Sequence, residues 1–344
     1  MKRETDFARS LQRYFNEYLG QEKGLSHNTI SSYGETFTLY IRYMRDSRKI
    51  APDRLLLADI TRDSILDFLQ WLTDENAYSS VSRNCRLATF RSFSRYMQYT
   101  DVKHIAQWQL IAGISPVRAT SRTVEYLSVD AIKLLLSQPD MTTPQGRRHL
   151  AILSLMYDSG ARVQEVADLT VGSLRTNGEN ITLQIIGKGG KARTVPLMTQ
   201  QVVNLRKYME ENRLTEWGRQ TEPLFSNVHG KKLTRAGISH ILQVYAAMAR
   251  QCATELIPEK ISCHTLRHSK AMHLLQAGVN IVNIRDFLGH ASIRTTDIYA
   301  RADGKAKREA LEKAYIDTLP EGGPEMGSWE KDKGLLDWLN GLKR

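Results

Sequence analysis

Cysteine is scarce in this chain. Its 344 residues include only three, Cys85, Cys252 and Cys263, and no two of them form a C-x-x-C pair. An odd number of scattered cysteines argues against a disulfide framework and a zinc ribbon, and it is typical of a reducing compartment. There is also no run of about 18 apolar residues and no apolar signal-peptide segment at the start, which argues against a membrane span and against secretion. These absences predict a soluble, cytoplasmic protein.

Acidic residues are in deficit as well. The chain has 37 Asp and Glu against 48 Lys and Arg, a net charge of +11, while its apolar content of 41% is ordinary for a globular protein. The length is sufficient for two domains with a sizeable core. The basic excess predicts a polyanionic partner, nucleic acid above all.

Composition and periodicity divide the chain into four parts. We expect a helical domain over residues 1–112, a linker over 113–126, a second domain over 127–318 and a tail over 319–344. The linker contains AGISPVRATSRTVEYLS, which is rich in Gly, Pro, Ser, Thr and Arg and has little periodicity. Ser128 is expected to cap the first helix of the second domain.

Apolar residues in the first domain recur at helical spacing. A first helix is expected to bury Leu11, Tyr14, Phe15, Tyr18 and Leu19 on one face. Ser26 has the position of an N-cap for a second helix, and Ile65 to Leu72 mark a third. The domain should therefore be a small helical bundle.

A fourth helix, SSVSRNCRLATFRSFSRYMQY, combines an apolar face with an excess of arginine. Leu87, Phe90 and Met97 are expected to point inward. The same stretch contains no acid and four arginines, Arg83, Arg86, Arg91 and Arg95. Because a solvated helix face normally mixes charges of both signs, we favour phosphate contact over a solvated face for these arginines.

The second domain is expected to be helical with one exception. ITLQIIGKGGKARTVPL alternates apolar and polar residues on either side of Gly187-Lys188-Gly189-Gly190, which predicts a β-hairpin with a basic, glycine-rich turn. The turn is not a Walker loop, because G-x-x-x-x-G-K-[ST] is not satisfied. The predicted fold class is therefore mainly α with a small β-sheet, an α+β second domain after a helical bundle.

Arg162 follows Ser159-Gly160 at the expected start of a helix. Backbone N–H groups point outward at such a position, which makes it a natural place for an anion. Glu165 and Asp168 follow within two turns and could pair with Arg162 or orient it.

The stretch HTLRHSKAMHLLQAG holds two histidines four residues apart, His264 and His268. They could bind zinc from one helix face, but a zincin needs Glu directly after the first histidine and Thr265 is there. No further ligand is close in sequence unless Cys263 takes part. Arg267 shares the face of His264, so a His/Arg anion site is favoured over a metal site.

FLGHASIRTTDIYARAD places His290 directly after a glycine and Tyr299 nine residues later. Each residue alone would be read as part of a core or an interface. Their order with the preceding motifs changes this interpretation. Arg162, Lys188 in its hairpin, His264-x-x-Arg267, Leu288-Gly289-His290 and Tyr299 together resemble the tyrosine recombinases, which include phage integrases, Xer-type resolvases and transposon-borne integrases.

The resemblance spans about Leu127 to Lys313 closely and the helical first domain, with GLSHNTISSY, more loosely. It implies that Tyr299 is the nucleophile that attacks a DNA phosphate and forms a 3′-phosphotyrosine, without ATP. It implies that Arg162 and Arg267 hold the non-bridging oxygens.

The resemblance also implies that Lys188 protonates the departing 5′-oxygen and that His290 donates a hydrogen bond to the phosphate. His264 would take or hold a proton near the tyrosine, and His268 is interpreted as structural. No metal ion or other cofactor is expected, because the two arginines neutralise the charge. Further DNA contacts are expected from Lys191, Arg193 and Arg294.

By the same resemblance, a core-binding domain and a catalytic domain would close as a C-shaped clamp on double-stranded DNA with inverted-repeat core sites. Four protomers, monomeric or weakly associated when free, would exchange strands through a Holliday junction near the bacterial nucleoid. An accessory DNA-bending or directionality factor is a further candidate partner. Because the core-binding helices begin at about Phe7, an additional arm-binding domain is not expected.

Several functions stay open. We favour the integrase or transposase of a mobile genetic element, with an Xer-like dimer resolvase as the alternative. A type IB topoisomerase would use the same chemistry as a monomer on one duplex. The complete residue set argues against a DNA-binding regulator without catalysis, and a metallohydrolase would require that a chelator abolish activity.

The tail ends in WEKDKGLLDWLNGLKR after the breaker LPEGGPEMGS. An apolar stripe is expected from its large residues, Trp329, Leu335, Leu336, Trp338, Leu339 and Leu342. Such a stripe needs a surface to bury against, either on its own domain or, as the resemblance favours, on a neighbouring protomer in a cyclic arrangement.

Overall fold

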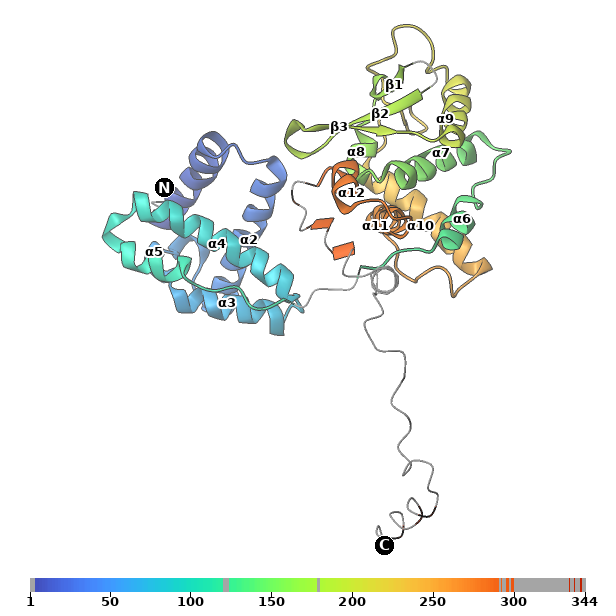
Figure 1. Ribbon diagram of the computed structural model, residues 1–344. Coiled ribbons are helices and arrows are strands. Elements are labelled where there is room, and N and C mark those ends of the chain that lie inside the picture. The colour runs from blue at the N-terminus through green and yellow to red at the C-terminus, as the bar shows by residue number, and fades with distance from the viewer. Residues whose placement is uncertain are drawn as a thin grey trace, which may run out of the picture. The chain divides into compact units, whose positions relative to one another are not determined.

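The structure is a computed structural model that describes residues 4–119, 124–177 and 180–290, together with the single residues 292, 295, 296, 298, 299, 334, 337 and 341. The chain divides into two compact units, Met1–Arg122 and Thr123–Arg344 (Figure 1). Both are mainly helical, and the second contains a three-stranded antiparallel sheet, so the predicted fold class is confirmed. The apolar stripe expected in the tail lies outside the described residues. In the part of the chain that is described, no helix is long and apolar enough to cross a membrane.

The first unit is a bundle of helices. Its elements are α1 (Asp6–Arg13), the π-helix η1 (Tyr14–Glu22), α2 (His27–Asp46), α3 (Arg62–Asp74), α4 (Ser80–Thr100) and α5 (Ile105–Ala112), with single 3₁₀ turns at Pro52–Arg54, Leu57–Asp59 and Val102–His104. Ser26 precedes α2 as predicted, and Thr61 and Ser79 accept hydrogen bonds from the first turns of α3 and α4. The third and fourth predicted helices are confirmed.

The first predicted helix changes pitch. It begins as α-helix and continues as π-helix from Tyr14. A π-helix brings residues five apart onto one side, and Tyr14 and Leu19 are both fully buried. Phe37 lies in the aromatic core beside them, with its ring centroid 5.4 Å from that of Phe90 and 5.2 Å from that of Phe93.

The four arginines of α4 do not form one exposed face. Arg95 is exposed and Arg91 is half-buried, with Nε donating to the Ala112 carbonyl at 3.0 Å. The Arg86 side chain is 11% exposed and pairs with Glu35 at 2.8 Å, and Arg83 is buried. Arg86 thus holds α4 to α2 within the unit, and phosphate contact by the four arginines stays a prediction.

The second unit places helices around the small sheet. Its helices are α6 (Val129–Leu136), α7 (Pro144–Ser159), α8 (Val163–Ala167), α9 (Thr199–Glu211), α10 (Arg235–Cys252), α11 (Cys263–Gln276) and α12 (Ile281–Leu288), with a 3₁₀ turn at Val171–Ser173. Ser128 caps α6 by accepting from the backbone of Ala131, as predicted. The core is built from apolar residues of α6, α7, α10 and the sheet.

The sheet has the order β1 (Leu174–Asn177), β2 (Asn180–Ile186), β3 (Ala192–Pro196). The predicted hairpin is β2 and β3, whereas β1 was not predicted because LRTN is short and polar. Leu183 pairs with Val195 and Ile185 pairs with Arg193. Leu183, Ile185 and Val195 are all buried, so Arg193 is on the face that packs against the core.

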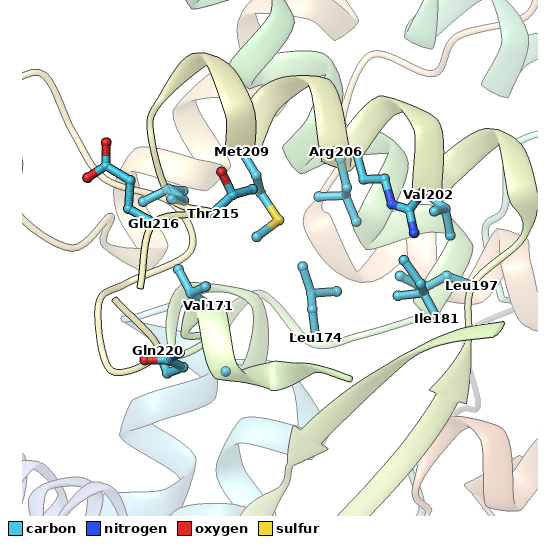
Figure 2. Close-up of a pocket in the computed structure, with 13 residues that line it drawn as sticks. Val171, Leu174, Ile181, Leu197, Val202, Arg206, Met209, Thr215, Glu216 and Gln220 are labelled. Atoms are coloured by element: carbon cyan, nitrogen blue, oxygen red, sulfur yellow. The ribbon is translucent and has the colours of Figure 1, made fainter. Parts of the chain in front are cut away.

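A cavity of about 300 Å³ separates the sheet from α9 (Figure 2). Leu174, Ile181 and Leu197 line one side, and Val202 and Met209 of α9 line the other, so the cavity is largely apolar. The residues described as lining it include none of the predicted catalytic side chains.

Candidate active site

Five of the six predicted catalytic residues have side chains that the structure describes, and they come together at one end of the second unit. Arg162 precedes α8, His264 and Arg267 lie in α11, and His290 and Tyr299 follow α12. The sixth, Lys188, is in the 3₁₀ turn Lys188–Gly190 between β2 and β3, and the structure does not describe its side chain.

Arg162 is the N-cap residue of α8, as its position after Gly160 predicted. Gly160 has a φ of 57° and ends α7 in the left-handed conformation, for which glycine is favoured. The Arg162 backbone N–H and Nη1 each donate to the Glu165 carboxylate at 2.8 Å. The predicted pairing of Arg162 with Glu165 is therefore confirmed, whereas Asp168 pairs with Lys232.

Glu165 is a buried carboxylate, 6% exposed, that two arginines share. Arg193 donates through Nη1 at 3.1 Å and Nη2 at 2.7 Å, in addition to the bonds from Arg162. Burial alone would raise the pKa of Glu165, but the hydrogen bonds from Arg193 and Arg162 outweigh it and lower the pKa to about 2. Glu165 is thus ionised throughout the physiological range.

Arg267 is fully buried and forms no ion pair with a carboxylate in the part of the chain that the structure describes. Nη1 donates to the Gly160 carbonyl and Nη2 to the Leu288 carbonyl, both at 2.6 Å, while Nε is buried without a partner in the described part of the chain. Burial, followed by the nearby charge of Arg162, lowers the pKa of Arg267 to about 9. Its charge is retained at pH 7. Among the described residues, Glu165 pairs with Arg162 and Arg193 but not with Arg267, so the positive charge of this cluster exceeds the negative charge.

Tyr299 lies beside these charges and is 1% exposed. Its hydroxyl is 2.8 Å from Nδ1 of His268, and its ring stacks on that of His290 with a centroid distance of 6.4 Å. Burial raises the pKa of Tyr299, against the opposing effect of Arg267 and Arg162. The hydroxyl is therefore protonated at rest, and it donates to Nδ1 of His268 in the tautomer that carries the ring proton on Nε2.

The structure corrects the interpretation of the two histidines in α11. His268, expected to be structural, is the one that contacts the tyrosine hydroxyl, whereas His264 is exposed and packs edge-on against His268 with ring centroids 4.6 Å apart. Burial and then His264 lower the pKa of His268 to about 4, so it is neutral at pH 7. Both histidines follow the same helical periodicity, and the sequence carries no signal that separates their roles.

His264 and His268 do not gain a third metal ligand from Cys263. The Cys263 sulfur is 3.5 Å from the Ser239 hydroxyl. Over the described ranges, no group of three or more His, Cys, Asp and Glu side chains could hold a metal ion.

His290 follows Gly289, whose φ of 64° ends α12 in the left-handed conformation. Its Nδ1 is 2.9 Å from the Thr296 hydroxyl. Burial and then Arg267 lower the pKa of His290 to about 4, so it too is neutral at pH 7. A neutral ring whose Nδ1 accepts from Thr296 carries its proton on Nε2 and can donate it to a ligand.

The predicted DNA contacts in the second unit divide into three cases. Lys191 is exposed beside the hairpin turn. Arg193 is 10% exposed and bound to Glu165 and to the Phe287 carbonyl, and its contact with DNA stays a prediction. Arg294 lies outside the described residues.

Comparison with known proteins agrees with this geometry. Residues 125–305 match the model of the phage integrase family, and residues 11–98 match the phage integrase N-terminal SAM-like domain. An integrase/recombinase of Sinorhizobium fredii, y4rC, is 33% identical over 99% of this chain and 100% of its own length. Tyrosine recombinase XerD of Listeria innocua is 36% identical over 83% of this chain and 91% of its own.

Among solved structures, the XerH site-specific recombinase bound to palindromic difH substrate, in a post-cleavage complex, superposes with a TM-score of 0.68. The match covers 92% of this chain and 91% of that one at 21% identity, and it establishes a shared fold. The chain therefore belongs to the phage integrase family of tyrosine recombinases, whose members are DNA strand-transfer enzymes.

Proposed function

We propose that this chain cuts and rejoins double-stranded DNA at a specific site, with Tyr299 as nucleophile. The observation that carries the proposal is the excess of fixed positive charge beside a tyrosine hydroxyl. Arg162 and Arg193 share the Glu165 carboxylate, and Arg267 binds only backbone carbonyls among the described residues, so a phosphodiester would supply the missing anion. The flanking histidines are neutral and leave this positive charge unchanged.

Each residue then has a role in one displacement. The Tyr299 oxygen attacks phosphorus, the bond from phosphorus to the 5′-oxygen breaks, and a 3′-phosphotyrosine forms. Arg162 and Arg267 hold the non-bridging oxygens, on which negative charge increases in the five-coordinate state. His290 donates a further hydrogen bond from Nε2.

Two protons move during this step. Nδ1 of His268 is 2.8 Å from the Tyr299 hydroxyl, and in the tautomer protonated on Nε2 it accepts the hydroxyl proton. Lys188 protonates the departing 5′-oxygen, and the position of its turn beside Glu165 supports this assignment, because Gly187 lies next to the Glu165 carboxylate. The reverse reaction with a new 5′-hydroxyl rejoins the strand.

The biological reaction proposed is integration or transposition of a mobile element through a Holliday junction, carried out by a tetramer on inverted-repeat core sites. The match to the Sinorhizobium fredii integrase/recombinase over 99% of the chain supports this choice. Dimer resolution is the second candidate, because the match to XerD covers 83% of the chain at 36% identity.

The test uses nicked duplexes that tile the DNA flanking the gene, with EDTA present. A nick next to the scissile phosphate releases a short fragment, so that the covalent intermediate accumulates. The full chain should form an SDS-resistant adduct with one duplex, and Tyr299→Phe should bind that duplex without forming it. Tyr245→Phe, at the buried tyrosine that contacts His149, is the matched control and should form the adduct. An adduct from Tyr299→Phe would refute the assignment of the nucleophile.

A further inference from the structure

We propose that Arg193 is a positioning residue that fixes the Lys188 hairpin in place relative to the rest of the catalytic cluster. The inference rests on the proposed function, because it concerns how Lys188 reaches the departing oxygen. We do not assign Arg193 a contact with the substrate, because its guanidinium is bound to the Glu165 carboxylate and the Phe287 carbonyl.

The strand register directs Arg193 inward. It pairs with Ile185 and is two residues from Val195, and both of these neighbours are fully buried. An arginine on a core-facing position requires partners for its donors. Here Nη1 and Nη2 bind Glu165 and Nε donates to the Phe287 carbonyl at 3.1 Å, so three separate donors are fixed.

These partners are close to catalytic groups: Glu165 is three residues after Arg162, and Phe287 is three residues before His290. Glu165 also binds Arg162 before α8. Phe287 lies in α12, just before the turn that carries His290. A Cβ at Gly289 would be 2.9 Å from Cδ of Arg193, so the Arg193 side chain packs directly on the residue before His290.

The same guanidinium lies against the start of the hairpin turn. A Cβ at Gly187 would be 3.8 Å from Nη1 of Arg193 and 3.5 Å from the Glu165 carboxylate. Gly187 also closes the turn by donating to the Lys191 carbonyl at 2.8 Å, and Lys188 is the next residue. Arg193 therefore fills the space between the residue before Lys188 and the residue before His290.

The planar fork of arginine is required for this geometry. Two parallel bonds to one carboxylate and a third bond to a carbonyl at the Nε side fix the side chain in one orientation. A lysine keeps the charge but has one nitrogen, so it cannot hold Glu165 and Phe287 together. The predicted defect of Arg193→Lys is therefore a misplaced Lys188 with the charge of the cluster intact.

The test compares two nicked substrates under single-turnover conditions with the full chain. One has the natural 5′-oxygen, and the other has sulfur in its place, a leaving group that needs no proton. Arg193→Lys should slow adduct formation on the oxygen substrate by about 100-fold, the scale of lost general-acid catalysis, and the sulfur substrate should restore most of that loss. Lys188→Ala should show the same pattern, and binding of the duplex should change less than about 3-fold in both.

Arg175→Lys is the matched control, because Arg175 is an exposed arginine of the same sheet, and it should behave like the wild type. Arg193→Lys that cleaves the oxygen substrate at the wild-type rate would overturn the proposal. A loss that the sulfur substrate does not restore would also overturn it, because the defect would then lie in the arginine clamp or in folding. Wild-type adducts on both substrates support the proposed function whatever Arg193 does, and their absence would overturn both.

Discussion

Replacing Glu165 by glutamine should lower the free energy of unfolding of the second unit by about 3–4 kcal/mol at pH 7. Burial would raise the pKa of the carboxyl, but the bonds from Arg193 and Arg162 bring it from an ordinary value of 4.5 to about 2. A difference of about 2.5 pH units at about 1.4 kcal/mol each gives this figure. It falls within the range of about 3–5 kcal/mol for breaking a buried ion pair from one side.

The pH dependence has a definite sign. Because the folded-state pKa of Glu165 is depressed, its stabilisation is complete above pH 4.5 and disappears as the pH falls towards 2. The difference between wild type and Glu165→Gln should be constant from about pH 5 to 8 and should shrink steadily below pH 4.5.

The measurement must separate the two units, because a chain of two domains does not unfold in one step. Urea titration with hydrogen-exchange mass spectrometry of the β2 and β3 peptides reports on the second unit, and peptides of α4 report on the first. Glu211→Gln, which removes a partly exposed partner of Arg147, is the control and should cost about 1 kcal/mol or less. Equal stability of wild type and Glu165→Gln at pH 7, or a difference that persists unchanged at pH 2.5, would refute the reasoning.

Three further predictions concern the nucleophile, the first unit and the tail. His268→Asn retains an acceptor for the Tyr299 hydroxyl but no base, so adduct formation should fall at pH 7 and recover as the pH rises; a flat pH profile would contradict this. Arg95→Ala should weaken DNA binding and reduce the salt slope by about one, whereas Arg86→Ala should destabilise the first unit, as binding at several salt concentrations and urea titration can test. Deletion after Pro320 should leave single-site binding intact and abolish synaptic complexes in gel-shift assays; normal recombination by the truncated chain would show that the tail does not act between protomers.

Local patterns were sufficient for most of the fold. Helical spacing identified α3 and α4, and Ser128 was recognised as a cap because its side chain satisfies a backbone N–H close in sequence. The hairpin followed from alternation and a glycine turn. The inward orientation of Arg193 could also be predicted, because Arg193 and Val195 are two residues apart on one strand and therefore face the same side of the sheet.

The sequence could not predict the roles of residues whose partners are far away along the chain. Glu35 and Arg86 are 51 residues apart in sequence, and Arg193 meets Glu165 from another element, so counting charges along α4 or the hairpin could not identify these pairs. His264 and His268 lie one turn apart on the same helix. Which of them meets Tyr299 depends on the path of the chain after α12, which no local pattern specifies.

A fully buried guanidinium without a carboxylate would ordinarily be costly, and the two helix ends around Arg267 explain how it is tolerated. Its Nη atoms bind carbonyls at the C-termini of α7 and α12, where helix dipoles are negative. Both helices end at a left-handed glycine, and a side chain at Gly160 would lie 2.9 Å from Leu288, so glycine permits the close approach of the two ends. Dipoles orient the guanidinium without neutralising it. Arg162, in contrast, already has a share of the Glu165 charge, so Arg267 should contribute more of the attraction for a phosphate, and its position is set before any DNA binds.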